Sequence, residues 1–499
     1  MSDPVALAID AGSSSVRAAL YDEHAELLPG TLCQIEIDIA LYPGGVAQLD
    51  AAHVRQALEA AIDSVLAAAP AIRADIAVVA MTTFWHSCVA VDGKGAPLTP
   101  VLTWADTRSE PEAAALRDML DAESVHRRTG CLLHPSYLPA KILWLRRHEP
   151  SLFERLAALV SFAQYCTMAW LGTMATSVSM ASGSGMFNDA SGSWDSELLD
   201  VLRVSGQTLG QIATGRELLP AVTGDYARRW PRLSGVPWRA PIGDGAASNV
   251  GAGCHVADRL ALMVGTSGAL RRCEPAPATD PVPHGLWRYR LDRGHVLTGG
   301  ALSDAGNAYA WLQDTLRLPS EDRCEAELAT RLPGQHGLVV LPFWSGERSL
   351  GWVGDATATV AGMKLHTTPL DLFQAALEGV TYRFGALFDA MARGGDTVVA
   401  TGGGLRASPA WLQLMADALG TPVVASAVSQ SSLRGAAIVG LRDVGATSGS
   451  AWPAAPVGAR FEPRVDYHEL HREARARQAT LYDREIGPAG SNLLARQTR

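Results

Sequence analysis

Two short runs of small and hydroxyl-bearing residues, far apart in the chain, each follow an apolar stretch. Residues 10–17 read Asp-Ala-Gly-Ser-Ser-Ser-Val-Arg, and residues 265–271 read Gly-Thr-Ser-Gly-Ala-Leu-Arg. Strand-like sequence flanks both runs, which predicts that each forms the tip of a β-hairpin. Gly and Ser leave backbone amides uncovered, and successive amides with hydroxyls form a concavity that binds anions. The pair predicts a duplicated phosphate-binding site, although ordinary hairpin turns share this composition.

Asp244, in the sequence Gly243-Asp-Gly245, is the candidate general base. The flanking glycines are expected to let a substrate approach closely. The dipole of a following helix is expected to keep the carboxylate ionised, ready to accept a hydroxyl proton. An aspartate that only caps the helix is the alternative interpretation.

A group of aromatic and polar residues follows two successive strand-like stretches of the first half. Its members are Trp85, His86, Trp104, Asp106 and Arg108. An aromatic wall with hydrogen-bonding groups suits a polyhydroxylated ligand, whereas scattered loop residues and a structural histidine are the alternative. In the second half, Arg348 ends a Trp-Ser-Gly-Glu-Arg run and is either a substrate or interdomain contact or half of a solvated Glu–Arg pair.

A glycine-rich run, Thr401–Ala407, lies between an expected strand and an expected helix. Bare backbone there could admit an adenine ring. From Gly402 the run also matches Gly-x-Gly-x-x-Ala, which raises a dinucleotide-binding oxidoreductase as a competing class. The next expected strand carries no acidic residue for a ribose, and the chain has neither a P-loop Gly-Lys-Ser/Thr nor a protein-kinase catalytic set.

The composition indicates a folded, enzyme-sized protein of two large domains. The chain has 499 residues, of which 47% are hydrophobic and 19% charged. A formal net charge of −9 without long basic runs argues against nucleic-acid or anionic-lipid partners, so we expect a small-molecule ligand and no membrane binding. Seven cysteines without a Cys-x-x-Cys pair, and a start without signal-peptide character, predict a cytoplasmic protein with reduced thiols.

The elements that would position these residues alternate between strand and helix. In the first half we expect a helix over 50–69 closing at Pro70, strands over 76–81 and 100–104, mostly helix over 111–170, and an irregular stretch over 177–194. In the second half we expect strands over 338–341 and 396–400, helices over 368–392 and 408–419, and a surface helix over 466–484. A composition shift near residue 240 predicts domains over 1–250 and 251–455, followed by a helical tail over 456–499.

Taken together, these segments resemble the FGGY carbohydrate kinases over roughly residues 5–445. The most specific part is Ala358–Met363, then seven residues, then Asp371–Glu378, which is similar throughout to the family's second signature. Lys141 and Trp144 keep the Lys-x-x-Trp pattern of the first signature, while Leu138 departs from it. The resemblance implies an α/β fold of two actin-like (ribonuclease H-like) ATPase domains with a cleft between them.

The resemblance also implies roles for individual residues in phosphoryl transfer from ATP with Mg²⁺. It makes Asp244 the base that deprotonates a sugar hydroxyl, and it places Asp10 near the metal. The first phosphate loop would contain Gly12, Ser13, Ser14, Ser15 and Arg17. The second would contain Gly265, Thr266 and Ser267, and the adenosine pocket would contain Gly402, Gly403, Gly404, Ser408 and Gln413.

The substrate implied by the resemblance is a sugar or a sugar acid. Residues 83–87 and 103–109 look most similar to the gluconate-kinase branch, whose substrate carries a carboxylate. Arg108, Arg348, Lys141 or His86 could supply the cation that such an acid needs. The same pattern resembles xylulose kinases, so a neutral ketose is an alternative substrate. An oxidoreductase and a non-catalytic actin-like nucleotide switch are the alternative classes of protein, and a homodimer is a possible oligomeric state.

Overall fold

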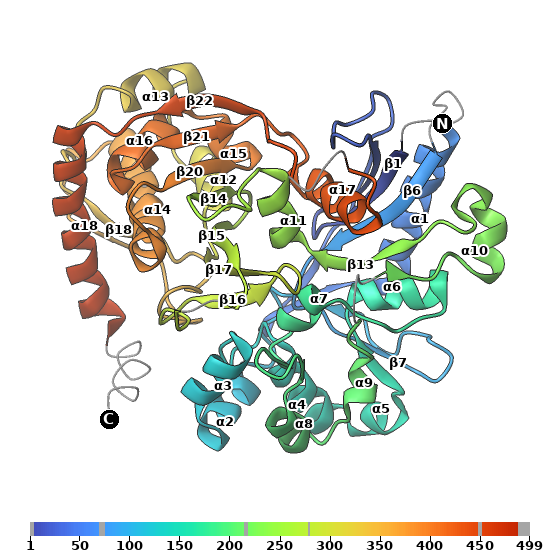
Figure 1. Ribbon diagram of the computed structural model, residues 1–499. Helices are drawn as coiled ribbons and strands as arrows, with labels where there is room; N and C mark the ends of the chain where they lie inside the picture. The colour runs from blue at the N-terminus through green and yellow to red at the C-terminus, as the bar shows by residue number, and fades with distance from the viewer. Residues whose placement is uncertain (1–3, 69–74, 214–217, 278–279, 448–451, 488–499) are drawn as a thin grey trace.

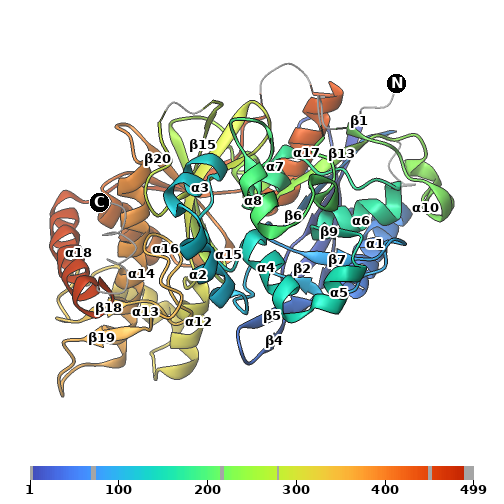
Figure 2. The same ribbon diagram turned by 90° about the horizontal axis from the view of Figure 1, so that it is seen from below.

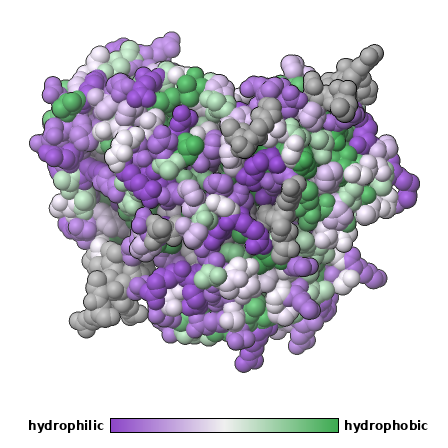
Figure 3. All heavy atoms as spheres, viewed as in Figure 1, coloured by the Kyte–Doolittle hydropathy of each residue, from purple (hydrophilic) through white to green (hydrophobic). Residues whose placement is uncertain are grey.

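The computed structural model describes residues 4–68, 75–213, 218–277, 280–447 and 452–487. Two lobes lie side by side, each built on a mixed β-sheet (Figure 1). Hydrophilic residues cover most of the face seen in Figure 3, and apolar residues appear there in small patches. No helix in the described ranges is long and apolar enough to cross a membrane.

The sheet of the first lobe combines an antiparallel hairpin with parallel strands. Its order is β12 (Leu218–Leu219), β13 (Trp238–Gly243), β6 (Asp75–Thr83), β1 (Pro4–Ala11), β2 (Ser15–Tyr21) and β3 (Cys33–Glu36). β1 pairs antiparallel with β2 and parallel with β6, which in turn pairs parallel with β13. The alternating apolar residues of β1, β2 and β6 pack with α1 (Ala51–Ala68) into the main core of this lobe.

The sheet of the second lobe repeats this arrangement. Its order is β16 (Trp287–Arg290), β17 (His295–Leu302), β15 (Gly268–Pro275), β14 (Arg259–Val264), β20 (Thr397–Thr401), β21 (Val423–Ser426) and β22 (Val457–Phe461). Here β14 pairs antiparallel with β15 and parallel with β20, as β1 does with β2 and β6. The runs at residues 10–17 and 265–271 therefore form the tips of equivalent hairpins, as the sequence predicts.

Smaller elements complete the first lobe. Its remaining strands are β4 (Ala40–Tyr42), β5 (Val46–Leu49), β7 (Val89–Val91), β8 (Val101–Leu102), β9 (Ala158–Val160), β10 (Phe187–Asn188) and β11 (Ser193–Trp194). Its helices are α2 (Glu110–Met119), α3 (Ala122–Thr129), α4 (Leu138–His148), α5 (Pro150–Arg155), α6 (Phe162–Leu171), α7 (Val178–Ser182), α8 (Ser196–Leu202), α9 (Gly206–Leu209) and α10 (Gly224–Arg229). The stretch over 177–194, expected to be irregular, begins with α7, because the Ser177 side chain caps its first turn.

Helices α14 and α16 lie between the second sheet and α18 (Figure 2). The helices of this lobe are α12 (Gly306–Thr315), α13 (Glu321–Leu328), α14 (Pro369–Met391), α15 (Gly403–Arg406), α16 (Pro409–Leu419) and α18 (Val465–Glu485), with the strand pair β18 (Val339–Leu341) and β19 (Thr359–Ala361). Thr368 begins α14 with a capping box, and Gly420 ends α16 in the left-handed conformation. The expected ends of these helices are confirmed.

Two helices cross at the junction of the lobes. α11 (Asp244–Gly251) follows the last parallel strand of the first sheet, and α17 (Ser431–Val444) follows β21 of the second. α17 nevertheless packs on β1 and β6 of the first sheet and crosses α11 (Figure 1). Residues far along the second half of the sequence thus belong to the core of the first lobe.

The tail beyond residue 456 is more than a helix. Its first element, β22, joins the edge of the second sheet beside β21, and α18 then packs on α14, α16 and β18. His471, Ala474 and Gln478 are buried in that contact. The end expected at Pro70 for the first long helix lies outside the described residues.

Candidate active site

A cavity of about 470 Å³ opens between the two lobes and is lined from both halves of the chain. It brings together most of the residues that the sequence singles out. These are Asp10, Gly12, Ser13, Ser14, Arg17, Trp85, His86, Trp104, Asp244, Gly265, Thr266, Ser267, Arg348, Gly402 and Gly403.

The first hairpin presents a partly satisfied carboxylate to this cavity. Asp10 Oδ2 accepts hydrogen bonds from the Ser432 hydroxyl at 2.6 Å and from Arg17 Nη1 at 3.5 Å. Asp10 Oδ1 is buried and has no partner among the described residues. Burial raises the pKa of Asp10, while Ser432 and Arg17 lower it.

Asp10 Oδ1 is therefore the atom best suited to a cation. Mg²⁺ commonly takes one or two carboxylates and completes its shell with water and phosphate oxygens. No cluster of three or more His, Cys, Asp or Glu side chains that could enclose a metal occurs in the described ranges. One open carboxylate oxygen at the edge of the cavity fits a Mg²⁺ ion held by a single carboxylate.

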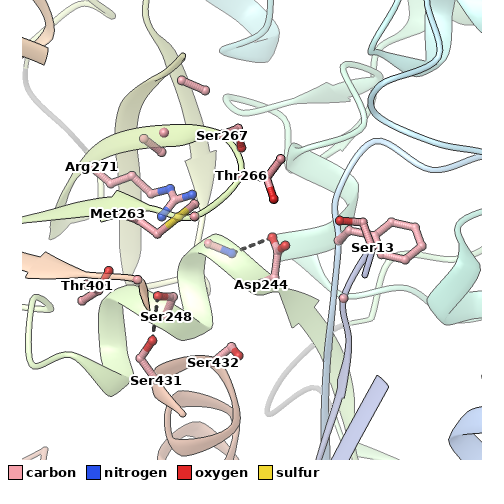
Figure 4. A pocket seen from close by; sticks show the side chains of 18 of the residues that line it. Ser13, Asp244, Ser248, Met263, Thr266, Ser267, Arg271, Thr401, Ser431 and Ser432 are labelled. Atoms are coloured by element: carbon pink, nitrogen blue, oxygen red, sulfur yellow. Dashed lines mark hydrogen bonds between the residues drawn. The ribbon is translucent and has the colours of Figure 1, made fainter. Parts of the chain in front are cut away.

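The second hairpin is closed and braced by backbone hydrogen bonds. The Gly265 amide donates to the Ser267 carbonyl at 3.0 Å, and the amides of Gly306 and Asn307, at the start of α12, donate to the carbonyls of Gly265 and Thr266. These bonds fix the tip so that the Thr266 side chain points toward Asp244 (Figure 4).

Asp244 is the first residue of α11, and its carboxylate lies below Thr266 and beside Ser13 (Figure 4). The Gly245 amide donates to Asp244 Oδ1 at 2.7 Å. Burial raises the pKa of Asp244 to about 6, although Arg271 lowers it. Desolvation therefore outweighs the favourable contacts at the helix start, but a carboxyl with this pKa is still largely ionised at pH 7.

The glycines beside Asp244 make room for protein side chains. A Cβ atom at Gly243 would lie 1.8 Å from the Trp85 indole, and one at Gly245 would lie 2.7 Å from it. The Gly245 position also abuts Arg271, at 3.0 Å. Gly243 therefore makes room for Trp85 rather than for a substrate, whereas Gly245, which abuts Trp85 and Arg271, itself lines the cavity.

Aromatic residues of the second lobe complete the wall begun by Trp85. Trp287 and Tyr289 on β16 stack with centroids 4.1 Å apart, and Tyr289 packs edge-on against Trp85 at 4.9 Å. The hydroxyls of Tyr289 and Tyr137 lie 2.6 Å apart. Sequence reasoning missed Trp287 and Tyr289, although their spacing of two places both on one face of a strand.

His86 is held in an unusual conformation at the edge of this wall. Its φ of 59° lies in the left-handed region, and its Nδ1 contacts the Gly183 carbonyl at 2.5 Å. Because a carbonyl only accepts, Nδ1 carries the proton, and Nε2 is an acceptor that has the Tyr289 hydroxyl 3.4 Å away. Burial, and next the charge of Arg348, hold the pKa of His86 well below 6.5, so the imidazole is neutral. Lys141 Nζ donates a hydrogen bond to the His86 carbonyl oxygen at 3.2 Å.

Asp106 and Arg108 pair with each other and do not line the cavity. Arg108 Nε lies 2.9 Å from both oxygens of Asp106, and the guanidinium also stacks over Trp144. Asp106 is fully buried and accepts a further bond from the Ala47 amide. A buried carboxylate needs a partner of opposite charge, so Arg108 is not a free cation.

Four more of the expected ligand residues lie outside the cavity lining. Ser15 is buried in β2 and accepts a hydrogen bond from Arg17. Ser408 caps α16 and bonds to Glu325, while Gln413 donates to Asp417 and to the Glu462 carbonyl. Gly404 follows the two glycines that do line the cavity.

The two glycines of the 401–407 run that line the cavity differ in their surroundings. Gly402 has a φ of 91°, and a Cβ there would lie 2.1 Å from the Val264 carbonyl oxygen. Gly403 has no heavy atom within 4 Å of its Cβ position. Gly402 thus permits close packing against β14, and Gly403 leaves space on the cavity side.

Comparison with known proteins matches both halves of the chain to one family. Residues 5–251 match the N-terminal domain of the FGGY family of carbohydrate kinases, and residues 260–444 match its C-terminal domain. A gluconokinase of Bacillus subtilis is 27% identical over 460 residues, which cover 88% of this chain and 87% of that protein. A glycerol kinase of Leptothrix cholodnii is 30% identical over 462 residues, covering 87% and 89%.

Solved structures show the same fold. A ligand-bound xylulose kinase from Lactobacillus acidophilus superimposes with a TM-score of 0.88 at 23% identity, covering 96% of this chain and 98% of that one. The expected α/β fold of two actin-like ATPase domains is confirmed. Because its two halves match the two domains of one family, this chain belongs to the FGGY family of carbohydrate kinases, which phosphorylate their substrates with ATP.

Proposed function

We propose that the protein transfers the γ-phosphoryl group of ATP to the terminal hydroxyl of D-gluconate, giving 6-phosphogluconate. The observation that carries this proposal is the position of Asp244, whose carboxylate faces the second hairpin. The same cavity holds an aromatic wall and Arg348, which forms no ion pair with any described residue. The similarity to gluconokinases supports the choice of a sugar acid. A neutral ketose is the alternative.

Asp244 acts as the general base in this proposal. It orients the attacking hydroxyl and accepts its proton as the phosphoryl group transfers. A base with a pKa of about 6 is ionised at pH 7 and still basic enough for this task. The neutral imidazole of His86 accepts a hydrogen bond from a sugar hydroxyl through Nε2, and the Trp85 ring packs on the sugar's carbon chain.

The two hairpins hold the phosphates. Phosphoryl transfer demands mainly alignment and neutralisation of charge, because the transferring group is loosely bonded in the transition state. Ser13, Ser14, Thr266 and Ser267 offer hydroxyls and amides from opposite sides of the cavity, and Arg17 adds a positive charge. Asp10 would hold Mg²⁺, which when bound neutralises charge on the phosphate oxygens.

Closure of the lobes completes the site. The sugar wall contains residues of both lobes, and the phosphate hairpins come from one lobe each. Closing the cleft therefore aligns both substrates and excludes water, which suppresses wasteful ATP hydrolysis.

The experiment that tests the proposal measures ADP release with Mg²⁺ and ATP against gluconate, xylulose, ribulose, glycerol and erythritol. We expect a gluconate-dependent rate, and we expect Asp244→Asn to lower kcat by about 10³-fold or more while sugar affinity changes little. If ADP is released only with a neutral sugar, the assignment of gluconate as the substrate is wrong. A near-normal kcat in Asp244→Asn would contradict the base assignment.

A further inference from the structure

Two arginine side chains in the cavity have no partner of opposite charge. Neither Arg271, on β15, nor Arg348 makes a side-chain hydrogen bond or an ion pair with any residue that the structure describes. Arg271 is only 8% exposed, and the Nε atoms of both arginines are buried and unsatisfied within those ranges. A buried guanidinium normally finds an acceptor, so both are open to a ligand.

Other arginines near the site are engaged. Arg17 bonds to Asp10, Ser15 and Gln430. Arg290, which follows Tyr289 on β16, forms an ion pair with Asp189. The lack of partners at Arg271 and Arg348 is therefore not general in this part of the protein.

The two free guanidiniums share one region of the cavity. The charge of Arg348 lowers the pKa of Arg271, and the charge of Asp244 raises the pKa of both arginines, although neither forms an ion pair with it in the described ranges. The Arg348 guanidinium lies over the Trp104 ring at 5.3 Å, and Arg271 rests against Gly245. Each guanidinium is thus held through its flat face, Arg348 by stacking and Arg271 by packing, and its N–H edge is left to point at a ligand.

We propose that Arg271 and Arg348 form the subsite that binds the carboxylate of an aldonate substrate and so determine the preference for sugar acids over neutral sugars. This inference rests on the proposed function and assigns Arg271 a role. Planar guanidinium groups match a carboxylate through paired N–H···O bonds, and the low dielectric of a buried pocket strengthens them.

The other cations considered from the sequence are less suited to this role. Arg108 is paired with Asp106, and His86 is neutral. Lys141 is 1% exposed, does not line the cavity and donates to backbone carbonyls of His86 and Ser136. The described cavity lining holds four arginines against two carboxylates, Asp10 and Asp244, so its excess of positive charge suits anionic ligands.

The test compares the affinity of gluconate with that of D-glucitol, which has the same carbon chain and a neutral CH₂OH in place of the carboxylate. Binding is followed by tryptophan fluorescence, since Trp85, Trp104 and Trp287 line the cavity. We expect the wild type to bind gluconate at least about 30-fold more tightly. Arg271→Gln and Arg348→Gln should each reduce this preference about tenfold or more, with the Kd for glucitol within about twofold.

Arg271→Lys and Arg290→Gln serve as comparison variants. The lysine keeps the charge but loses the paired geometry, so it should retain part of the preference, and it also tests the subsite if the glutamine variant fails to fold. Arg290 is already paired with Asp189 outside the cavity, so Arg290→Gln should leave the preference unchanged.

Three outcomes would separate the subsite from the proposed function. If gluconate is phosphorylated but the arginine variants keep the wild-type preference, the subsite is wrong and the function stands. If the variants lose kcat equally on acidic and neutral substrates, Arg271 acts on the phosphoryl group instead. If acid binding depends on both arginines but no sugar acid is phosphorylated, the subsite stands and the function is wrong.

Discussion

Asp244 carries the titration that should be visible in the kinetics. Its pKa of about 6 comes from burial, and the carboxylate must be ionised to accept a proton. With saturating Mg²⁺ and ATP, kcat/KM for the sugar should be level above about pH 7 and fall about tenfold per pH unit below about pH 6. A pH–rate series over pH 4.5–9 would check this.

Arg271 provides the matched variant for this pH dependence. The Arg271 guanidinium lowers the pKa of Asp244, so its removal in Arg271→Gln should raise that pKa. The acidic limb of the kcat/KM profile should therefore move to higher pH. A limb that stays in place would show that a group other than Asp244, such as the nucleotide, is titrating.

Local sequence predicts some of these site residues and not others, for a physical reason. Gly12 to Ser14 and Thr266 lie at hairpin tips, and tips are visible as small residues between strand-like runs. Arg271 and Tyr289 lie within strands, so the parts of the chain that the fold brings to the other side of the cavity decide what their side chains contact. Ser432 reaches Asp10 only because α17 packs on the other lobe, a contact that spans more than 400 positions of the chain.

At the scale of elements, the crossing of α11 and α17 explains the small residues of both helices. A Cβ at Gly251 would lie 1.8 Å from the Ser431 carbonyl oxygen, and one at Gly435 would lie 1.8 Å from the Ala247 carbonyl oxygen. The Ala-, Gly- and Ser-rich composition after Asp244 therefore serves helix packing at the junction of the lobes.

Gly435→Ala should destabilise the protein, although alanine is the better helix former by about 1 kcal/mol. The new methyl group meets backbone rather than a flexible side chain, so the helices must separate, at about 1–3 kcal/mol. The midpoint of thermal unfolding should fall and kcat should fall with it. Gly93→Ala, where no heavy atom lies within 4 Å of the Cβ position, should change neither. An unchanged midpoint in Gly435→Ala would contradict the tight crossing.

The sequence predicts the individual elements better than their assembly. The ends of α14 and α16 follow from local signals, namely a capping Thr or Ser, a Pro in the first turn and, for α16, a Gly after the last. The placement of α17 on the first sheet and of β22 at the edge of the second depends on tertiary packing. These contacts decide which residues belong to each lobe, and they cannot be predicted from local sequence patterns.

At the scale of the whole molecule, the residues that most clearly mark the family lie away from the cavity. Glu378, at the end of the second signature, is buried and accepts hydrogen bonds from the Gly334 amide, Gln374 and Tyr382. Asp371 caps α14. These signature residues therefore hold the frame of the second lobe together.

The C-terminal helix is connected to the site through a buried network. The Tyr482 hydroxyl on α18 donates to Glu347 Oε2 at 2.7 Å, and Arg383 on α14 bonds to the other oxygen of Glu347. Glu347 is 2% exposed and immediately precedes Arg348, which reaches into the cavity. α18 thus helps to fix the loop that carries a proposed substrate-binding cation.

Tyr482→Phe should therefore weaken sugar binding selectively. The ring and its contact with the Arg383 guanidinium remain, but Glu347 loses a hydrogen bond worth about 1 kcal/mol and the loop before Arg348 gains freedom. We expect the KM for gluconate to rise about three- to tenfold, with kcat and the KM for ATP nearly unchanged. Tyr467→Phe, on the same helix, should leave all three constants unaltered. If the two KM values rise together in Tyr482→Phe, α18 acts through the stability of the whole lobe, and the specific link to Arg348 is wrong.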